Sequence, residues 1–290
     1  ALIVAFSDRY TALGSENPAK AAGLRLGDWI VSAGGRPVRS NDDLTAAIQA
    51  ADGAPLTVVY RRDGVQHTSA LTPAQDEKGR YKAGVWVRDS GAGIGTMSFV
   101  DAQHGTFAGL GHSISDTDTG TELTLLSGEI VPVTITGCIR GAAGSPGELR
   151  GEFSAKAVGQ VLANDAAGVY GSYTGGTIGQ AVPVANVQEV TPGEAELWTT
   201  VQGTTAQPYK VRIERVTMTG SDPNRNLLIK VTDERLLEKT GGIVQGMSGS
   251  PIVQNGQLAA VLTHVLVNDP AKGYAIFATT MLEKADAVIK

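Results

Sequence analysis

GGIVQGMSGSPIV, residues 241–253, is followed by the apolar run QLAAVLTHVLV and carries a serine between small residues. A nucleophilic serine needs its hydroxyl on a tight turn, and it needs backbone NH groups beside it that point at the developing oxyanion. Gly246 can adopt the angles that turn its NH inward, and Gly249 lets the chain leave without a side-chain clash. Ser248 is therefore the predicted nucleophile. Ser250 is the alternative, less favoured because the glycines are placed to serve Ser248.

The pattern G-x-S-G-x-P around Ser248 resembles the nucleophile loop of chymotrypsin-like peptidases. Met247 and Ser250 stand where most of that superfamily carry Asp and Gly. The resemblance implies that Ser248 attacks the substrate and that the NH groups of Gly246 and Ser248 form the oxyanion hole. The competing interpretation is a surface turn rich in glycine and serine, without chemistry.

A base is required, because a serine hydroxyl is a poor nucleophile at neutral pH. The chain has four histidines, which are His67, His104, His112 and His264. His112 lies in GLGHSISDTDTG, at the end of an apolar run, and it precedes the serine as the base does in chymotrypsin-like chains. His112 is therefore the predicted base. His264 follows Ser248 by sixteen positions (264 − 248 = 16) and lies on a predicted strand. We expect either that His264 contacts the substrate or that it is held in a barrel wall.

Residues 1–74 have a pattern of their own. Within NPAKAAGLRLGDWIVSAGGRPV, Pro18 can begin a short helix at its first turn. Residues 41–50 begin with a capping residue and place apolar side chains on one helical face. A hairpin with an Asp-Gly turn at residues 63–64 closes the segment. The pattern predicts a small α+β domain.

This order of elements resembles the PDZ domains of bacterial peptidases, in which NPA-x-x-AGL-x-x-GD-x-I is the most recognisable stretch. A PDZ domain would hold a peptide strand by β-augmentation. The chain begins abruptly at ALIVAF, which is typical of the inside of a strand, and we expect that an upstream segment has been removed. In PDZ domains of this permuted type the carboxylate-binding loop precedes that strand, so half of the peptide groove would be missing.

From residue 79 onward the sequence changes to short β-prone runs separated by glycine, a residue that occurs 37 times in the chain. Many closely spaced strands with glycine-rich turns are typical of a barrel or sandwich, and roughly two hundred residues suit two small barrels. We therefore predict a mainly β fold, with a PDZ-like domain at residues 1–74 and a two-barrel, chymotrypsin-like peptidase domain at residues 79–290. Residues 280–290 indicate a terminal helix.

The motifs GHSISDTDTG, EKTGGIVQGMSGSPIVQNG and THVLVNDPAKGYAIF, together with the N-terminal PDZ pattern, resemble the SpoIVB peptidases of endospore-forming bacteria. The resemblance covers essentially the whole chain. It implies a serine endopeptidase that is exported into the space between the two forespore membranes. There it would cleave itself and a subunit of a membrane-embedded protease complex, and so signal to the mother cell.

The same resemblance implies a catalytic triad. The family's serine and histidine fall on Ser248 and His112, and its acid falls on Asp233, fifteen positions before the serine (248 − 233 = 15). In most chymotrypsin-like enzymes the acid lies on the base's own barrel. Asp116 and Asp118, just after His112, are therefore rival candidates, although a carboxylate in an acidic loop is usually only solvated.

Several classes of function are disfavoured by the composition. The net charge is −5 and no basic stripe occurs, so nucleic acid is not expected as a partner. The histidines show no metal-ligand spacing and the glycine-rich stretches lack the lysine of a phosphate loop, so we predict neither a metal nor a cofactor. Cys138, the single cysteine, is expected to be a small buried hydrophobe rather than a reactive thiol.

Two other functions compete with a signalling peptidase. One is a tethering protein, in which a peptidase-like scaffold and its PDZ domain bind peptides while catalysis is vestigial. The joint presence of Gly246, Ser248 and His112 argues against it. The other is an HtrA-like quality-control protease, in which the PDZ domain typically follows the peptidase domain. The reverse order here favours the signalling role.

Overall fold

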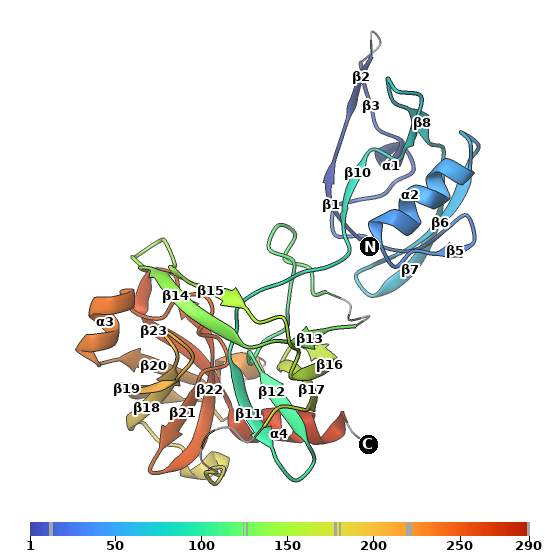
Figure 1. The fold of residues 1–290 in the computed structure, drawn as a ribbon. Helices are drawn as coiled ribbons and strands as arrows, with labels where there is room; N and C mark the ends of the chain where they lie inside the picture. Colours follow the sequence, from blue (N-terminus) through green and yellow to red (C-terminus); the bar gives the residue numbers. More distant parts are fainter. Residues whose placement is uncertain are drawn as a thin grey trace. The chain divides into compact units, whose positions relative to one another are not determined.

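The computed structural model describes residues 1–11, 14–123, 125, 127–176, 179, 181–218 and 222–288. The chain forms two compact units (Figure 1). The first unit comprises Ala1–Ala92 and Ser115–Thr121, and the second comprises Gly93–Ile114 and Glu122–Lys290. A short segment that follows His112 in sequence therefore belongs to the first unit.

The first unit is built on one six-stranded sheet. Its strands follow the order β10-β1-β4-β6-β7, with β5 paired to β4. They are β1 (Leu2–Phe6), β4 (Trp29–Ala33), β5 (Arg36–Pro37), β6 (Leu56–Arg62), β7 (Val65–Leu71) and β10 (Val85–Arg88). Two short hairpins lie outside this sheet, formed by β2 (Arg9–Thr11) with β3 (Gly14–Glu16) and by β8 (Ala74–Gln75) with β9 (Tyr81–Lys82).

Both predicted helices of this unit form, as α1 (Pro18–Ala21) and α2 (Asn41–Ala50). Ser40 and Asp43 make a reciprocal capping box at the start of α2, which satisfies NH groups that the helix itself leaves unpaired. The helix buries Leu44, Ala47 and Ile48, the face that the sequence periodicity indicates. The hairpin turn places Asp63 and Gly64 at φ +50° and +77°, as a tight Asp-Gly turn requires.

The strand β10 completes the sheet, and residues before and after it contact α2. It pairs antiparallel with β1. Gln49, near the end of α2, exchanges hydrogen bonds with the backbone of Tyr81, and the carboxylate of Asp89 accepts from the NH of Asn41 at the start of the helix. The sequence pattern predicts that the first domain ends at residue 74, whereas the first compact unit also includes the strands β8, β9 and β10.

A closed barrel of six strands forms much of the second unit. Its order is β18-β19-β20-β23-β22-β21. The strands are β18 (Gly193–Thr199), β19 (Gln207–Val216), β20 (Leu227–Val231), β21 (Pro251–Gln254), β22 (Gln257–Leu266) and β23 (Asp269–Phe277). Apolar side chains that alternate along these strands fill the barrel, so its interior is a packed core.

The remaining strands of the second unit form an open sheet and a hairpin. The sheet has the order β11-β12-β17-β16-β13, and β14 pairs with β15. The strands are β11 (Met97–Asp101), β12 (Thr106–Gly109), β13 (Glu129–Ile130), β14 (Val133–Ile139), β15 (Glu148–Phe153), β16 (Gly159–Asp165) and β17 (Gly168–Tyr173). Where we expected a closed first barrel, the described residues form a half-barrel, because β14 and β15 make their ladder with each other.

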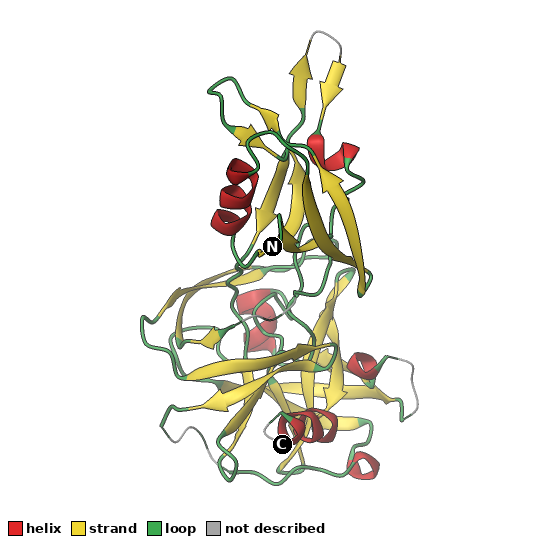
Figure 2. Ribbon diagram, turned by 90° about the vertical axis from the view of Figure 1, so that its right-hand side faces the viewer, coloured by secondary structure: helices red, strands yellow, loops and turns green. Residues whose placement is uncertain are grey.

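Short helices connect the strands of the second unit. They are the 3₁₀ turns η1 (Val187–Glu189) and η2 (Pro223–Arg225) and the helices α3 (Glu234–Thr240) and α4 (Ala278–Ala287). The helix α4 confirms the expected terminal helix and buries Ala278, Met281 and Ala285. Strands dominate throughout (Figure 2). The predicted class, mainly β with a small α+β domain in front, is confirmed.

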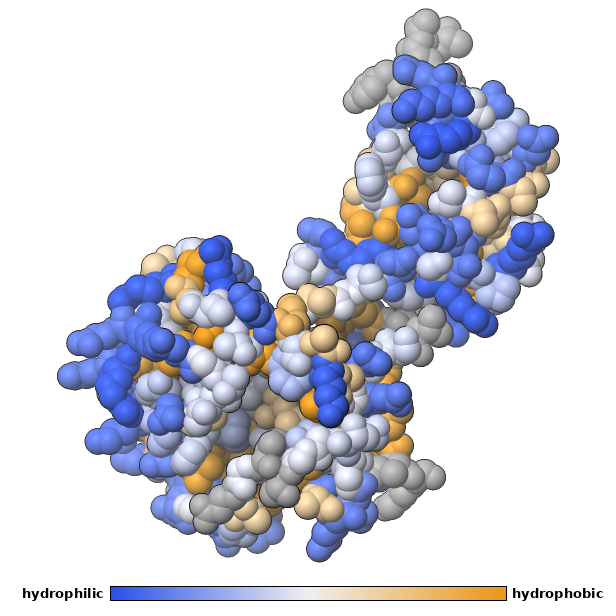
Figure 3. Space-filling model, viewed as in Figure 1, coloured by the Kyte–Doolittle hydropathy of each residue, from blue (hydrophilic) through white to orange (hydrophobic). Residues whose placement is uncertain are grey.

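Most of the surface seen in Figure 3 is hydrophilic or neutral, and apolar residues show in separate areas. The exposed large apolar side chains include Trp86, Phe153 and Leu162, which come from different strands. Scattered apolar residues of this kind are normal for a folded protein. Within the described residues, no helix is long and apolar enough to cross a membrane.

Candidate active site

Ser248 lies on a tight turn in front of β21. Gly246 and Gly249 flank it with φ values of +95° and +94°. A Cβ atom on Gly249 would lie 2.0 Å from the carbonyl oxygen of Thr96, so this position requires glycine. Ser248 is half-buried, whereas Ser250 is fully buried at 0% exposure. Ser248 is therefore the more accessible of the two hydroxyls, and its role as nucleophile stays a prediction.

Two backbone NH groups of the turn at Ser248 have no partner among the residues that the structure describes. In the part of the chain that the structure describes, the NH groups of Gly246 and Ser248 donate to no carbonyl or side chain. The NH of Gly249 donates to the carbonyl of Leu262 at 2.8 Å. Unpaired NH groups next to a nucleophile are what an oxyanion hole needs, because they can donate to the negative oxygen of a tetrahedral intermediate.

The hydroxyl of Ser248 is held by a neighbouring strand. Its Oγ donates to the carbonyl oxygen of Thr263 on β22 at 2.8 Å. The hydroxyl proton therefore points at a backbone carbonyl rather than at a ring nitrogen. Attack on a substrate requires a rotation of the Ser248 side chain toward its base, and such catalytic hydrogen bonds often form only in the complex.

Thr96, just before β11, links the nucleophile loop to the segment that carries the predicted base. Its NH donates to the carbonyl of Ser248 at 2.9 Å, and its own carbonyl accepts from the NH of Leu110 at 3.2 Å. Its hydroxyl donates to the carbonyl of Gly246 at 3.3 Å. Sequence reasoning missed Thr96, because its role depends on backbone pairing between residues far apart in the chain.

His112 follows β12 on a bend in which Leu110 and Gly111 both have left-handed φ values, +67° and +70°. A Cβ atom on Gly111 would lie 2.8 Å from Cγ2 of Thr263, so the bend packs closely against β22. The Nδ1 atom of His112 lies 2.8 Å from the carbonyl oxygen of Ser113. A carbonyl can only accept, so Nδ1 carries the proton and Nε2 is left with the lone pair that a base needs.

The ring of His264 lies beside the ring of His112, with the two centroids 4.9 Å apart and the planes 34° apart. Burial, and then the nearby His112 and Arg225, lower the pKa of His264 to about 4. Its Nδ1 atom is buried without a hydrogen-bond partner among the described residues. His264 is therefore neutral at neutral pH. Its contact with substrate stays a prediction.

A charged pair that sequence reasoning did not identify lies near His264. The negative charge of Asp222 acts to raise the pKa of His264, against the larger effects of burial and of Arg225. Oδ2 of Asp222 lies 3.0 Å from Nε of Arg225. The Arg225 guanidinium sits over the ring of Tyr274 at 5.2 Å, and Tyr274 is the cross-strand neighbour of His264. No sequence motif marks Asp222 as part of this site.

Asp233 caps the start of α3 and is bound on both of its oxygens. It accepts from the NH of Lys210 at 3.0 Å and from the NH of Arg235 at 3.0 Å, and it forms an ion pair with the Arg235 guanidinium at 2.7 Å. Hydrogen bonding to Arg235 lowers the pKa of Asp233 to about 2. The carboxylate of Asp233 therefore bonds to backbone NH groups and to Arg235, whereas a triad acid would bond to the imidazole of the base.

The sheet register separates Asp233 from His264. Leu228 on β20 opposes Tyr274, which in turn opposes His264. Asp233 lies five residues beyond Leu228 (233 − 228 = 5), roughly 16 Å further along β20 and its continuation at about 3.3 Å per residue. Within the described residues the structure brings Ser248, His112 and His264 together and does not join Asp233 to them.

The rival carboxylates, Asp116 and Asp118, belong to the first unit. Asp116 is 2% exposed, so the expectation of a solvated loop carboxylate is wrong for this residue. It accepts hydrogen bonds from Thr119 and pairs with Arg88, and Asp118 pairs with the same guanidinium. Both carboxylates are therefore engaged by groups of the first unit.

Comparison with known families identifies the chain. Residues 79–282 match the family described as SpoIVB peptidase S55. The chain belongs to this family. Residues 9–62 match the PDZ domain family. This S55 peptidase is thus a serine protease with a PDZ domain in front of it. No curated protein matches the chain.

Solved proteases show distant similarity to this S55 peptidase. The active form of the Rv3671c protease from M. tuberculosis is 19% identical, over 51% of this chain and 65% of that chain, with a TM-score of 0.35. Its inactive form is 16% identical, over 49% and 72%, with a TM-score of 0.33. The HtrA-type protease AlgW with a decapeptide is 14% identical, over 60% and 55%, with a TM-score of 0.34.

The site of this S55 peptidase can support acyl transfer from its own side chains. Ser248 supplies a hydroxyl on a glycine turn, and His112 supplies a nitrogen lone pair and a proton fixed on Nδ1. The carbonyl of Ser113 takes the position that a carboxylate occupies in a full triad, where it orients the imidazole. A carbonyl is uncharged, so it stabilises the imidazolium less than a carboxylate would.

One group of side chains could hold a metal ion. Ligand atoms of Asp101, His104 and Asp286 lie within 4.8 Å of one another. Nδ1 of His104 already lies 2.5 Å from Oδ2 of Asp101, and the side chains of His104 and Asp286 are 53% and 40% exposed. Such exposed acidic groups need no ion.

The single cysteine, Cys138, is half-buried. Burial raises the pKa of its thiol, which disfavours the reactive thiolate.

Proposed function

We propose that this S55 peptidase is an endopeptidase that cleaves a protein partner, and also its own chain, in sporulation signalling. The proposal rests on the surroundings of the Ser248 hydroxyl, which lies on a glycine turn next to two NH groups without a partner among the described residues. This hydroxyl donates to Thr263 on β22, the strand that also carries His264 against His112. In the proposed roles, Ser248 is the nucleophile, His112 is the base, and the NH groups of Gly246 and Ser248 form the oxyanion hole.

Catalysis would proceed by acyl transfer in two steps. The Ser248 hydroxyl turns from the carbonyl of Thr263 to Nε2 of His112 and gives up its proton as Oγ attacks the substrate carbonyl carbon. The scissile bond breaks when the imidazolium returns that proton to the leaving amine, which leaves an acyl-enzyme. Water, deprotonated by the same ring, then hydrolyses the ester. The triad role of Asp233 stays a prediction of the family resemblance.

The substrate side of the proposal follows from the domains. A PDZ domain holds an extended peptide by β-augmentation, which would bring a partner or a segment of this chain to the protease. We propose that the partner is a subunit of a membrane-embedded protease complex and that cleavage takes place in the space between the forespore membranes. Both statements rest on the resemblance of the sequence motifs to the SpoIVB peptidases.

The active-site serine can be tested without knowing the cleavage sequence. The full chain is treated with a fluorophosphonate, which phosphonylates an activated serine, and is also followed by mass spectrometry over time for self-cleavage. We expect labelling on Ser248 and chain fragments that accumulate. Ser248→Ala should remove both and leave thermal unfolding nearly unchanged, because among the described residues the hydroxyl makes a single hydrogen bond, to Thr263.

Ser250→Ala is the matched control, since it removes a buried hydroxyl in the same loop. We expect its labelling to stay within a few-fold of the unmodified chain. A chain that is never labelled at Ser248 but still binds peptides would be a tethering protein. Loss of labelling in Ser250→Ala alone, with the fold retained, would move the nucleophile to Ser250.

A further inference from the structure

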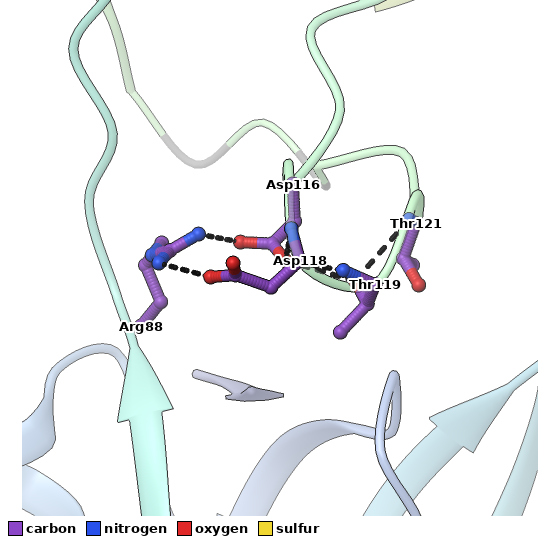
Figure 4. A network of polar contacts seen from close by, with 5 residues as sticks. All are labelled: Arg88, Asp116, Asp118, Thr119 and Thr121. Atoms are coloured by element: carbon purple, nitrogen blue, oxygen red, sulfur yellow. Dashed lines mark hydrogen bonds and ion pairs between the residues drawn. The ribbon is translucent and has the colours of Figure 1, made fainter. Parts of the chain in front are cut away.

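Arg88 pairs with two carboxylates that follow His112 in the sequence (Figure 4). It is the last residue of β10, where it lies opposite Leu2 of β1. One guanidinium nitrogen bonds Oδ2 of Asp116, and another bonds Oδ2 of Asp118 at 2.7 Å. We call Arg88 with these two carboxylates the clamp. The clamp joins the last strand of the first unit to the segment Ser115–Thr121.

The buried half of the clamp is built into a rigid turn. The side chain of Asp116 is 0% exposed. Its Oδ1 accepts from the NH groups of Asp118 and Thr119, at 3.1 and 2.9 Å, and from the Thr119 hydroxyl at 3.0 Å. The backbone NH of Asp116 donates to the carbonyl of Thr121 at 2.8 Å. Removal of Arg88 would leave a buried carboxylate without its counter-charge, which is costly.

A second contact seats the same segment on the first unit. Gly27, in the loop before β4, has a φ of +84°, and a Cβ atom there would lie 3.0 Å from Oγ1 of Thr121. The segment Ser115–Thr121 thus approaches the loop before β4 so closely that glycine is favoured at position 27. Together with the clamp, this contact fixes both the start and the end of Ser115–Thr121 on the first unit.

The residues on either side of Ser115–Thr121 are hydrogen-bonded to each other in the second unit, and the first of them, Ile114, lies two residues after His112. The NH of Ile114 donates to Oδ1 of Asn164 at 2.7 Å, and Nδ2 of Asn164 donates to the carbonyls of Ile114 and Leu123 at 3.1 and 2.9 Å. The NH of Leu123 donates to the carbonyl of Ile114 at 3.0 Å. His112 is therefore joined by only Ser113 to a closed loop whose tip is held by Arg88.

We infer that Arg88 is a positioning residue for His112, so that the peptidase reaction depends on the attachment of Ser115–Thr121 to the first unit. The carbonyl that orients the imidazole belongs to Ser113, within this short connection. A displaced tip would shift that carbonyl and the ring together. This inference rests on the proposed role of His112 as base.

The test uses fluorophosphonate labelling of the full chain, because it requires no known substrate. Arg88→Gln should lower the limiting rate of Ser248 labelling by at least about tenfold, since a misplacement of about 1 Å can cost a hundredfold in rate. The reagent concentration at half-maximal rate should stay within about twofold, because Arg88 does not touch the reagent. Arg88→Lys should recover part of the rate, as it keeps the charge but loses the two-pronged geometry.

Arg80→Gln is the matched control. It removes another arginine–aspartate pair of the same unit, between exposed Arg80 and Asp76, and should leave the labelling rate unchanged. Asp118→Asn tests the clamp from its exposed side in case Arg88→Gln fails to fold. It should slow labelling less than Arg88→Gln does, and the effects in the double variant should be less than additive.

Hydrogen exchange separates this inference from the proposed function. In Arg88→Gln the amides of residues 114–123 should exchange faster, whereas those of the barrel strands should not. If no form of the protein is labelled at Ser248, the proposed function fails and the exchange result still decides the clamp. If folded Arg88→Gln or Asp118→Asn shows unchanged exchange at residues 114–123, or if Arg88→Gln keeps the full labelling rate, the inference is overturned.

Discussion

The proposed nucleophile and the proposed base of this peptidase each bond to a backbone carbonyl. Ser248 donates to Thr263 at 2.8 Å, and Nδ1 of His112 lies 2.8 Å from the oxygen of Ser113. In the described structure, the hydroxyl of Ser248 and Nδ1 of His112 are thus both bonded to carbonyl oxygens. Turning the hydroxyl costs one hydrogen bond, about 1 kcal/mol net, which the new bond to imidazole can offset. Substrate binding can supply the trigger for that rotation.

The half-buried His264 makes a testable contribution to the pH dependence of folding. Its pKa is about 4 in the folded chain, against an ordinary value of about 6.5. Between these values the unfolded chain binds more protons, so the free energy of unfolding falls as the pH falls from about 6.5 to about 4. Above this window, where both states are neutral, the contribution is fully present.

His264→Gln should therefore flatten the pH dependence of urea unfolding between about pH 6.5 and 4, the window set by the two pKa values. The measurement is the urea midpoint of both proteins across this range, read as a difference so that the titration of carboxylates cancels. His67→Gln, at an exposed histidine, serves as the control. Equal slopes for the unmodified chain and His264→Gln would show that His264 is not held neutral by burial.

Among the elements, the short helix α3 is organised around Asp233. The carboxylate caps the helix and joins its first turn to Lys210 of β19 and to Arg235. The family resemblance makes the same residue the triad acid. The two roles predict different results for one substitution, since a cap and ion pair act on stability whereas a triad acid acts on turnover.

From the contacts we expect Asp233→Asn to destabilise the fold by about 1–2 kcal/mol, through the weakened cap and the lost charge at the helix start. If Asp233 acts only through these contacts, the Ser248 labelling rate should fall less than about tenfold, because such a group adds little to the proton transfer. Chemical denaturation and labelling kinetics measure the two effects. A fall of about a hundredfold or more with folding retained would establish the acid role instead, given the cost of removing a triad acid.

The two units of the molecule have separate cores. The core of the first unit is made by residues of β1, β4, β6 and α2, and the largest core of the second is inside the barrel. Domains with cores of their own can unfold independently. The chain nevertheless returns to the first unit through Ser115–Thr121, so local changes there can reach the residues next to His112.

We expect urea unfolding to follow two transitions with different midpoints. The chain has three tryptophans, of which Trp29 and Trp86 lie in the first unit and Trp198 in the second. Fluorescence of Trp198→Phe would report on the first unit, and that of Trp29→Phe with Trp86→Phe would report on the second. Coincident midpoints in the two variants would mean that the units unfold as one cooperative system.

The amino-acid sequence alone determined the fold class and the residues of the nucleophile loop. Glycine at positions 246 and 249, the PDZ pattern and the alternating apolar runs are local features, and their backbone and packing requirements can be recognised without any partner. The helix α2 and its buried face are of the same kind. These features form because local preference and the final fold agree.

The tertiary structure decided how the site is held together. Thr96 between the loops of Ser248 and His112, and the Arg88 clamp, depend on pairing between residues far apart in sequence, which no local pattern records. The sequence around Asp116 is typical of a solvated loop. Asp116 is nevertheless buried, because the guanidinium of Arg88 on β10 neutralises its charge. A charge can be buried only where such a partner is provided, and only the folded chain shows where that partner is.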